Sequence, residues 1–191
     1  VPRRSAVRSL SDLGGARISV GSAGSGTEQV ARQILEAFGF SYEEVDARYL
    51  TFSESAASLR DGAIDAAIIS VGYPAAAVLE ATTTGGARLI PIEPERIEAL
   101  RERYPYYSVG QIPAEAYPGV TEEISTIAMM NWVVAREDLD GSVARLLLDI
   151  LQDERETLAQ VHEMAGQVRL EKLEDAPIPL HPGAEAWRRR D

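Results

Sequence analysis

The sequence contains no cysteine, only two histidines and a single lysine among its 191 residues. Without cysteine the chain forms no disulfide and offers no thiolate to a metal. Cysteine content therefore does not indicate whether the protein works in an oxidising or a reducing compartment. We interpret His162 as a solvated residue of a charged helix and His181 as a turn residue in a proline-rich tail. No Gly-x-Ser-x-Gly elbow and no His, Asp or Glu cluster with metal-ligand spacing occurs. The sequence therefore predicts neither an enzyme nor a cofactor site.

Long apolar runs and an excess of positive charge are also missing. No uninterrupted apolar run approaches the ~20 residues of a transmembrane helix. The formal net charge of −11 argues against general binding to nucleic acid or to anionic membranes. A single local anion pocket stays compatible with this charge, because it depends on nearby dipoles. With 45% hydrophobic residues, the chain can bury a core in one large domain or two small ones.

The most informative stretch is the glycine-rich segment Gly21-Ser22-Ala23-Gly24-Ser25-Gly26-Thr27-Glu28. A β-branched run, residues 18–20, precedes it, and an amphipathic run with Val30, Ile34 and Phe38 on one stripe comes after it. This order predicts a strand, a tight turn and a helix whose first amides point outward and favour an anion. Ser25 and Glu28 have the spacing of a capping box. The simpler alternative is a strand-to-helix turn without a ligand.

The residues after the last glycine narrow the identity of the anion. A phosphate-binding P-loop has lysine and then serine or threonine directly after its last glycine. In this sequence Thr27 and Glu28 occupy those two positions. The dinucleotide fingerprint lacks its third glycine, because Gln29 stands there. The pattern favours a small carboxylate over a nucleotide.

Apolar strands and amphipathic helices alternate along the first half of the chain. This order is typical of an α/β fold with a parallel sheet and flanking helices. The expected strands are residues 18–20, 45–50, 64–71 and 88–92, and the expected helices include 53–59, from Pro74 to about 81, and one opened by Pro94.

A second turn, Gly72-Tyr73-Pro74, ends the third expected strand. Ligands of parallel sheets bind at the carboxyl ends of strands, so this turn and the Gly21–Thr27 turn can face one crevice. Tyr73 would line that crevice with its ring and hydroxyl, or else be an ordinary surface aromatic.

The second half of the chain has a weaker pattern. Residues 104–120 predict an ordered but irregular loop, and residues 125–136 an extended segment that crosses between two lobes. Asp140 begins a helix whose apolar face contains Leu146, Leu147, Ile150 and Leu151.

Six motifs in register resemble those of the TAXI-type solute receptors of tripartite (TRAP) transporters. They are Gly21-x-x-Gly-Ser-Gly-Thr, Asp61-Gly-Ala-Ile-Asp-Ala, Gly72-Tyr-Pro, Tyr104-Pro-Tyr-Tyr, Ile112-Pro-x-x-x-Tyr117-Pro-Gly and His181-Pro-Gly-Ala.

The resemblance implies a type 2 periplasmic-binding-protein fold and an extracytoplasmic receptor without enzymatic activity or a cofactor. Such a receptor captures a small acidic solute, a glutamate-like amino acid or a dicarboxylate, and delivers it to sodium-coupled TRAP membrane subunits. By this resemblance Ser25, Gly26 and Thr27 bind the solute from one turn. Gly72, Tyr73 and Pro74 bind it from the other.

The chain departs from the family pattern at its start. No apolar stretch comes after Val1-Pro2-Arg3-Arg4, so we expect no signal peptide here. By resemblance, residues 9–124 form the second lobe, whereas residues 125–191 return to a first lobe that is mostly missing. We therefore expect weak solute binding. We also expect the helices after residue 140 to find substitute cover, by refolding onto the second lobe or by self-association. The alternatives are an enzyme on a similar two-lobed scaffold, acting on a carboxylate, and a non-binding interaction module that uses the loop with Tyr104 and Tyr117.

Overall fold

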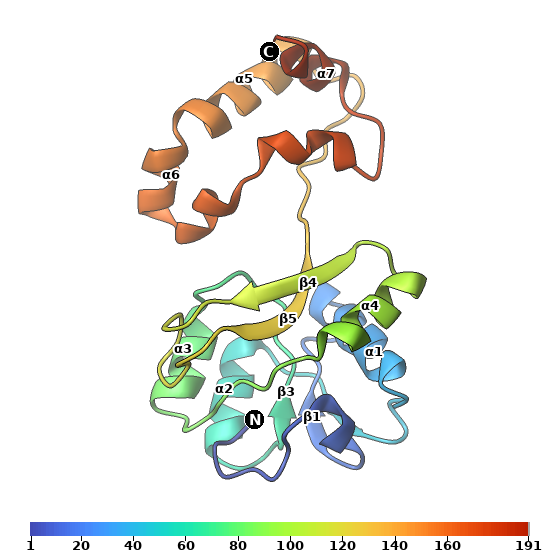
Figure 1. Ribbon diagram of the computed structural model, residues 1–191, viewed down its shortest axis with the longest axis vertical. Coiled ribbons are helices and arrows are strands. Elements are labelled where there is room, and N and C mark those ends of the chain that lie inside the picture. The colour runs from blue at the N-terminus through green and yellow to red at the C-terminus, as the bar shows by residue number, and fades with distance from the viewer. Residues whose placement is uncertain (191) are drawn as a thin grey trace. The chain divides into compact units, whose positions relative to one another are not determined.

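The computed structural model describes residues 1–190 and divides into two compact units, Val1–Met130 and Asn131–Asp191. Figure 1 shows sheets and helices in the first unit and helices in the second. No helix within residues 1–190 combines the length and apolar character that crossing a membrane requires.

The first unit is built on a three-stranded parallel sheet. Its order is β2 (Asp46–Arg48), β1 (Arg17–Ser19), β3 (Ala66–Ala67), with β1 paired in parallel to both neighbours. The chain thus adds β2 on one side of β1 and then β3 on the other. Right-handed crossovers consequently place α1 (Gly26–Ala37) and α2 (Phe52–Arg60) on opposite faces. The predicted α/β class with flanking helices is confirmed.

Burial on both faces explains why β1 is central. Ile18, Ser19 and Val20 are fully buried, and the Ser19 hydroxyl is satisfied by the Ser55 hydroxyl at 2.7 Å. Helix α1 ends where predicted, because Gly39 adopts a left-handed φ of 83°.

Two predicted helix starts shift by two residues. Helix α2 is capped by Thr51 rather than Ser53, because Thr51 and Glu54 form a reciprocal capping box. Helix α3 (Ala76–Thr83) begins after Pro74, with Ala75 as its N-cap. By contrast, α4 (Pro94–Arg103) starts at Pro94 as predicted. A short 3₁₀ helix, η1 (Leu10–Leu13), precedes β1 and buries both of its leucines.

The prediction of a fourth strand at residues 88–92 is wrong. The backbone hydrogen bonds of this segment lead to separate parts of the chain. Arg88 N–H donates to the Val1 carbonyl at 2.8 Å, and Ile92 N–H donates to the Ser125 carbonyl at 3.0 Å. No continuous ladder forms within this described segment, although it is held in place.

The predictions for residues 104–120 and 125–136 also need correction. Strand β4 (Tyr107–Ile112) lies within the expected loop and pairs antiparallel with β5 (Ile124–Met129). Tyrosines and prolines around β4 hide its alternation in the sequence. Strand β5 ends at Met129, and residues 130–136 form neither helix nor strand.

The second unit consists of short helices. They are α5 (Gly141–Asp153), α6 (Arg155–Val161), η2 (Glu163–Gln167), η3 (Leu170–Asp175) and α7 (Pro182–Arg188). Asp140 caps α5 as predicted, with its carboxylate accepting from Ser142 N–H at 2.7 Å. Helix α7 packs on α5, where the Trp187 indole donates to Asp149 at 2.7 Å.

The predicted apolar face of α5 is largely exposed. Leu146 is 57% exposed, Leu147 47% and Ile150 41%, whereas Leu151 is half-buried. Cover of this face, by refolding onto the second lobe or by self-association, stays a prediction.

An ion pair joins the first residues of β1 to the segment that enters β3. The Asp65 carboxylate accepts from Arg17 Nε at 3.0 Å, from Nη2 at 2.8 Å and from the Arg17 backbone N–H at 2.9 Å. Arg17 thereby lowers the pKa of Asp65.

We predict that Asp65→Asn lowers the melting temperature by a few degrees at neutral pH. Because the folded-state pKa of Asp65 is depressed, its contribution is complete above the unfolded value of about 3.9 and disappears as pH falls through the folded value. The difference from the unmodified protein should vanish in acid, measured by thermal unfolding over that pH range. Asp61→Asn is the control, because Asp61 makes a one-point contact with Arg60. A difference that persists unchanged in acid would contradict this reasoning.

A close contact between α5 and α7 gives a second stability prediction. A Cβ added at Gly183 would lie 2.9 Å from the Ala144 Cβ and from the Gly141 Cα. Gly183→Ala should therefore destabilise the second unit by about 1–3 kcal/mol. Urea unfolding followed by tryptophan fluorescence measures this loss, because both tryptophans, Trp132 and Trp187, belong to the second unit. Gly166→Ala, with no atom within 4 Å of the added Cβ, should be nearly neutral, and an equal loss in both variants would refute the packing argument.

Candidate functional site

The turn between β1 and α1 depends on glycine. Gly21 has a φ of 92° and Gly24 a φ of 72°, both in the left-handed region. A Cβ at Gly21 would also lie 2.8 Å from the Thr27 Cβ. Ser25 N–H donates to the Ser22 carbonyl at 3.0 Å, which closes the turn. Residues 21–25 therefore connect the buried strand to α1 through a tight turn.

Ser25 is the N-cap of α1, and Gly26 and Thr27 are its first residues. The Ser25 hydroxyl accepts from Glu28 N–H at 3.1 Å. The first amides of a helix have no acceptor within it, and those of Gly26 and Thr27 hold these positions. Gly26 is exposed, with open space where a Cβ would stand. An oxyanion could accept from these amides without displacing a side chain.

Glu28 does not complete the predicted capping box. Its carboxylate instead accepts from Arg32 Nη2 at 2.8 Å and from the Tyr42 hydroxyl at 3.2 Å. The Arg32 guanidinium also lies 4.2 Å from the centre of the Tyr42 ring. Burial, followed by the nearby Glu28 charge, raises the pKa of Tyr42. The Glu28 charge is thus compensated by Arg32 and hydrogen-bonded by Tyr42.

The second predicted turn lies between β3 and α3. Ile68 N–H donates to the Ser19 carbonyl at 2.9 Å, which extends the β1–β3 pairing toward this turn. Gly72, Tyr73 and Pro74 are all partly buried, and the Tyr73–Pro74 peptide is cis. The Tyr73 side chain packs against a cluster formed by Ala75, Val78, Tyr117 and Val120.

Sheet order explains why the two turns belong to one edge. Strands β1 and β3 are parallel neighbours, so the segments that come after them leave the same edge of the sheet. The strand order reverses at β1, and ligands of such sheets bind in the crevice beyond the carboxyl ends at that point. The six predicted residues comprise backbone amides, two hydroxyl side chains, a tyrosine and a proline, without a charged group. This set can hold a small anion.

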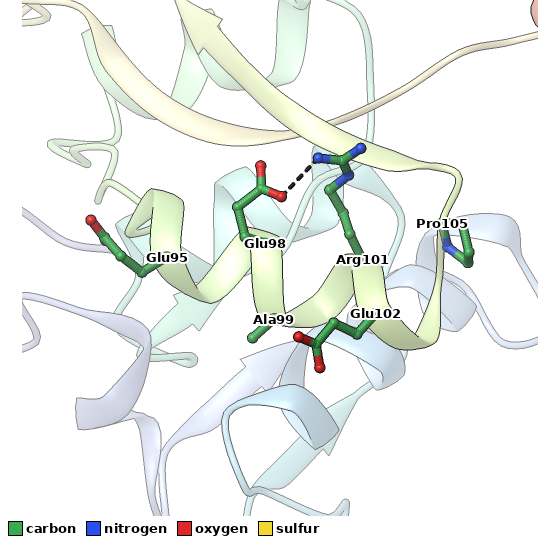
Figure 2. Close-up of a pocket in the computed structure, with 6 residues that line it drawn as sticks. All are labelled: Glu95, Glu98, Ala99, Arg101, Glu102 and Pro105. Carbon is green, nitrogen blue, oxygen red and sulfur yellow. Dashed lines mark hydrogen bonds and ion pairs between the residues drawn. The ribbon is translucent and has the colours of Figure 1, made fainter.

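A pocket elsewhere in the first unit has the wrong charge for this purpose. Figure 2 shows it along α4. Its lining residues are Glu95, Glu98, Ala99, Arg101, Glu102 and Pro105. Arg101 is already paired with Glu98 at 2.7 Å, so the remaining carboxylates would repel an acid.

The two histidines have capping roles. His181 Nδ1 accepts from Gly183 N–H at 3.1 Å at the start of α7, and its Nε2 lies 3.0 Å from the Leu139 carbonyl. His162 Nδ1 accepts from Met164 N–H at 3.2 Å. Within residues 1–190, no group of three His, Asp or Glu residues could hold a metal ion.

Sequence reasoning missed one contact at the second turn. The Tyr117 hydroxyl accepts from Ala75 N–H at 3.0 Å, across 42 residues of sequence. No local spacing predicts such a bond. Although Tyr117 belongs to a motif of the resemblance, nothing in the sequence joins that motif to the turn.

Comparison with known proteins gives one family and a similar solved structure. The family model described as the NMT1-like family matches residues 1–188. The crystal structure of the periplasmic aliphatic sulphonate binding protein SsuA from Escherichia coli is similar, with 15% sequence identity and a TM-score of 0.49. The match covers 100% of this chain and 56% of that protein, so this chain spans little more than half of its length.

Proposed function

Because the chain belongs to the NMT1-like family, we propose that it forms part of a periplasmic solute receptor that binds a small acidic solute. The family consists of periplasmic solute-binding proteins and not of enzymes. Family membership agrees with the expectation of a non-enzymatic protein.

The observation that carries the proposal is the parallel pairing of β1 and β3, because the segments that contain the two turns therefore leave the same edge of the sheet. Ser25, Gly26 and Thr27 offer a hydroxyl-capped helix start, and Gly72, Tyr73 and Pro74 come after the neighbouring strand. Amides and the dipole of α1 favour a negative group at the first turn, while the Tyr73 ring can pack against an apolar body.

A small carboxylate fits this arrangement better than a phosphate ester. No lysine directly follows the last glycine of the turn, where Thr27 and Glu28 stand instead. We propose a glutamate-like amino acid or a dicarboxylate as the solute. The TAXI-type motifs further suggest delivery to the membrane subunits of a sodium-coupled TRAP transporter.

A binding screen tests this proposal. Thermal unfolding of the protein would be measured with L-glutamate, 2-oxoglutarate and succinate, with ethanesulfonate and nitrate as other anions, and with glucose as a neutral control. A ligand that binds the folded state raises the melting temperature. Stabilisation by a carboxylate supports the proposal. Stronger stabilisation by ethanesulfonate or nitrate would indicate that the solute is a sulfonate or an inorganic anion. Turnover of a carboxylate would favour an enzyme. The absence of stabilisation by any acid would contradict the receptor hypothesis.

We predict that Gly26→Val weakens binding of the stabilising acid about tenfold or more, because the new side chain occupies the space in front of the first amides. Its effect on stability should be small, since an added Cβ at Gly26 meets no atom within 4 Å. Calorimetric titration and thermal unfolding measure the two effects. Ser53→Val, an exposed first-turn substitution on α2, is the control and should bind normally. Unchanged affinity in Gly26→Val would exclude the turn as a binding element.

A further inference from the structure

We propose that Tyr117 is a positioning residue that holds the Gly72–Tyr73–Pro74 turn in the geometry that receives the solute. The inference rests on the proposed function of that turn. It assigns a role to the loop between β4 and β5 (residues 113–123), which lies far from the turn in sequence.

The first support is a buried hydrogen bond. Tyr117 is only 3% exposed, and its hydroxyl oxygen accepts from Ala75 N–H at 3.0 Å. Ala75 comes directly after Pro74 and is the N-cap of α3, so this bond fixes the exit of the turn. Burial raises the pKa of Tyr117, and the hydrogen bond from Ala75 N–H opposes this shift.

The second support is apolar packing around the same bond. Ala75, Val78, Tyr117 and Val120 form one buried cluster, and the Tyr73 side chain packs against it. The Tyr117 ring therefore supports the turn through its apolar surface as well as through its hydroxyl. Displacing the ring would remove both constraints from Tyr73.

The third support is the rigidity of the loop that carries Tyr117. Glu115 N–H donates to the Val120 carbonyl at 2.8 Å, and Val120 N–H donates to the Tyr117 carbonyl at 3.0 Å. Arg3 Nη2 donates to the Pro118 carbonyl at 3.3 Å and to the Thr82 carbonyl at 3.5 Å, which ties the loop to α3. The hydroxyl is thus presented from a support fixed at several points.

The test compares two buried tyrosines that each lose one hydroxyl. Tyr117→Phe removes the bond to Ala75, whereas Tyr107→Phe removes a bond to Gln33 in a separate apolar cluster. Affinity for L-glutamate and for succinate would be measured by calorimetric titration, and exchange of the Ala75 amide by NMR. Tyr117→Phe should lower affinity about three- to tenfold and speed exchange at Ala75. Tyr107→Phe should bind as the unmodified protein does, despite a comparable loss of stability.

The outcomes separate this inference from the proposed function. Equal affinity of Tyr117→Phe and the unmodified protein would overturn the inference alone, and so would an equal loss of affinity in both tyrosine variants. If the unmodified protein binds neither these acids nor any other, the proposed function fails and the inference fails with it. If Tyr117→Phe does not fold, Arg3→Gln loosens the loop without altering Tyr117. It should weaken binding in the same direction, and unchanged affinity there would count against the inference.

Discussion

The placement of β1 between two parallel neighbours is the constraint on which the first unit depends. Because Ile18, Ser19 and Val20 are fully buried, these positions must be apolar or, as in Ser19, paired with a hydroxyl from α2. The strand is short, so its register depends on Arg17 and Asp65 at one end and on continued backbone bonds to Arg48 and Ile68 at the other. A slip in this register would change where the chain leaves β1 and β3 and would displace both candidate turns. The placement of these turns therefore depends on the same hydrogen bonds as the sheet.

Local signals in the sequence were sufficient for the elements nearest the candidate site. The glycine-rich turn, the start of α1 at Ser25 and its end at Gly39 each depend on residues within a few positions, and all three are found as predicted. Prediction failed where the decisive partner lies far along the chain. Residues 88–92 were apolar enough for a strand but find separate partners, and β4 becomes a strand only because β5 lies beside it. The Tyr117 contact with Ala75 has the same origin.

Electrostatics at the start of α1 shows how an unfavourable residue is accommodated. A carboxylate in the first turn stabilises the helix dipole but would repel a bound acid. Arg32 and Tyr42 reduce this conflict, because both donate hydrogen bonds to the Glu28 carboxylate. From the sequence alone, Glu28 is an unfavourable neighbour for a bound acid. The structure shows the two residues that contact its carboxylate: Arg32, one helical turn away, and Tyr42, fourteen residues away.

The second unit is stabilised in a different way from the first. Ala144 and Leu148 are the apolar side chains buried within its described residues, while Leu146, Leu147 and Ile150 expose much of their surface. Full burial of one such side chain is worth about 1.5–3 kcal/mol. Because these three are 41–57% exposed, together they forgo about 2–4 kcal/mol, a substantial part of the stability of a typical domain. Specific contacts such as Trp187 with Asp149 and the close approach at Gly183 fix the geometry of α5 and α7 without replacing that missing hydrophobic term. The amphipathic pattern of α5 therefore indicates a helix adapted to a larger apolar surface than the second unit alone provides.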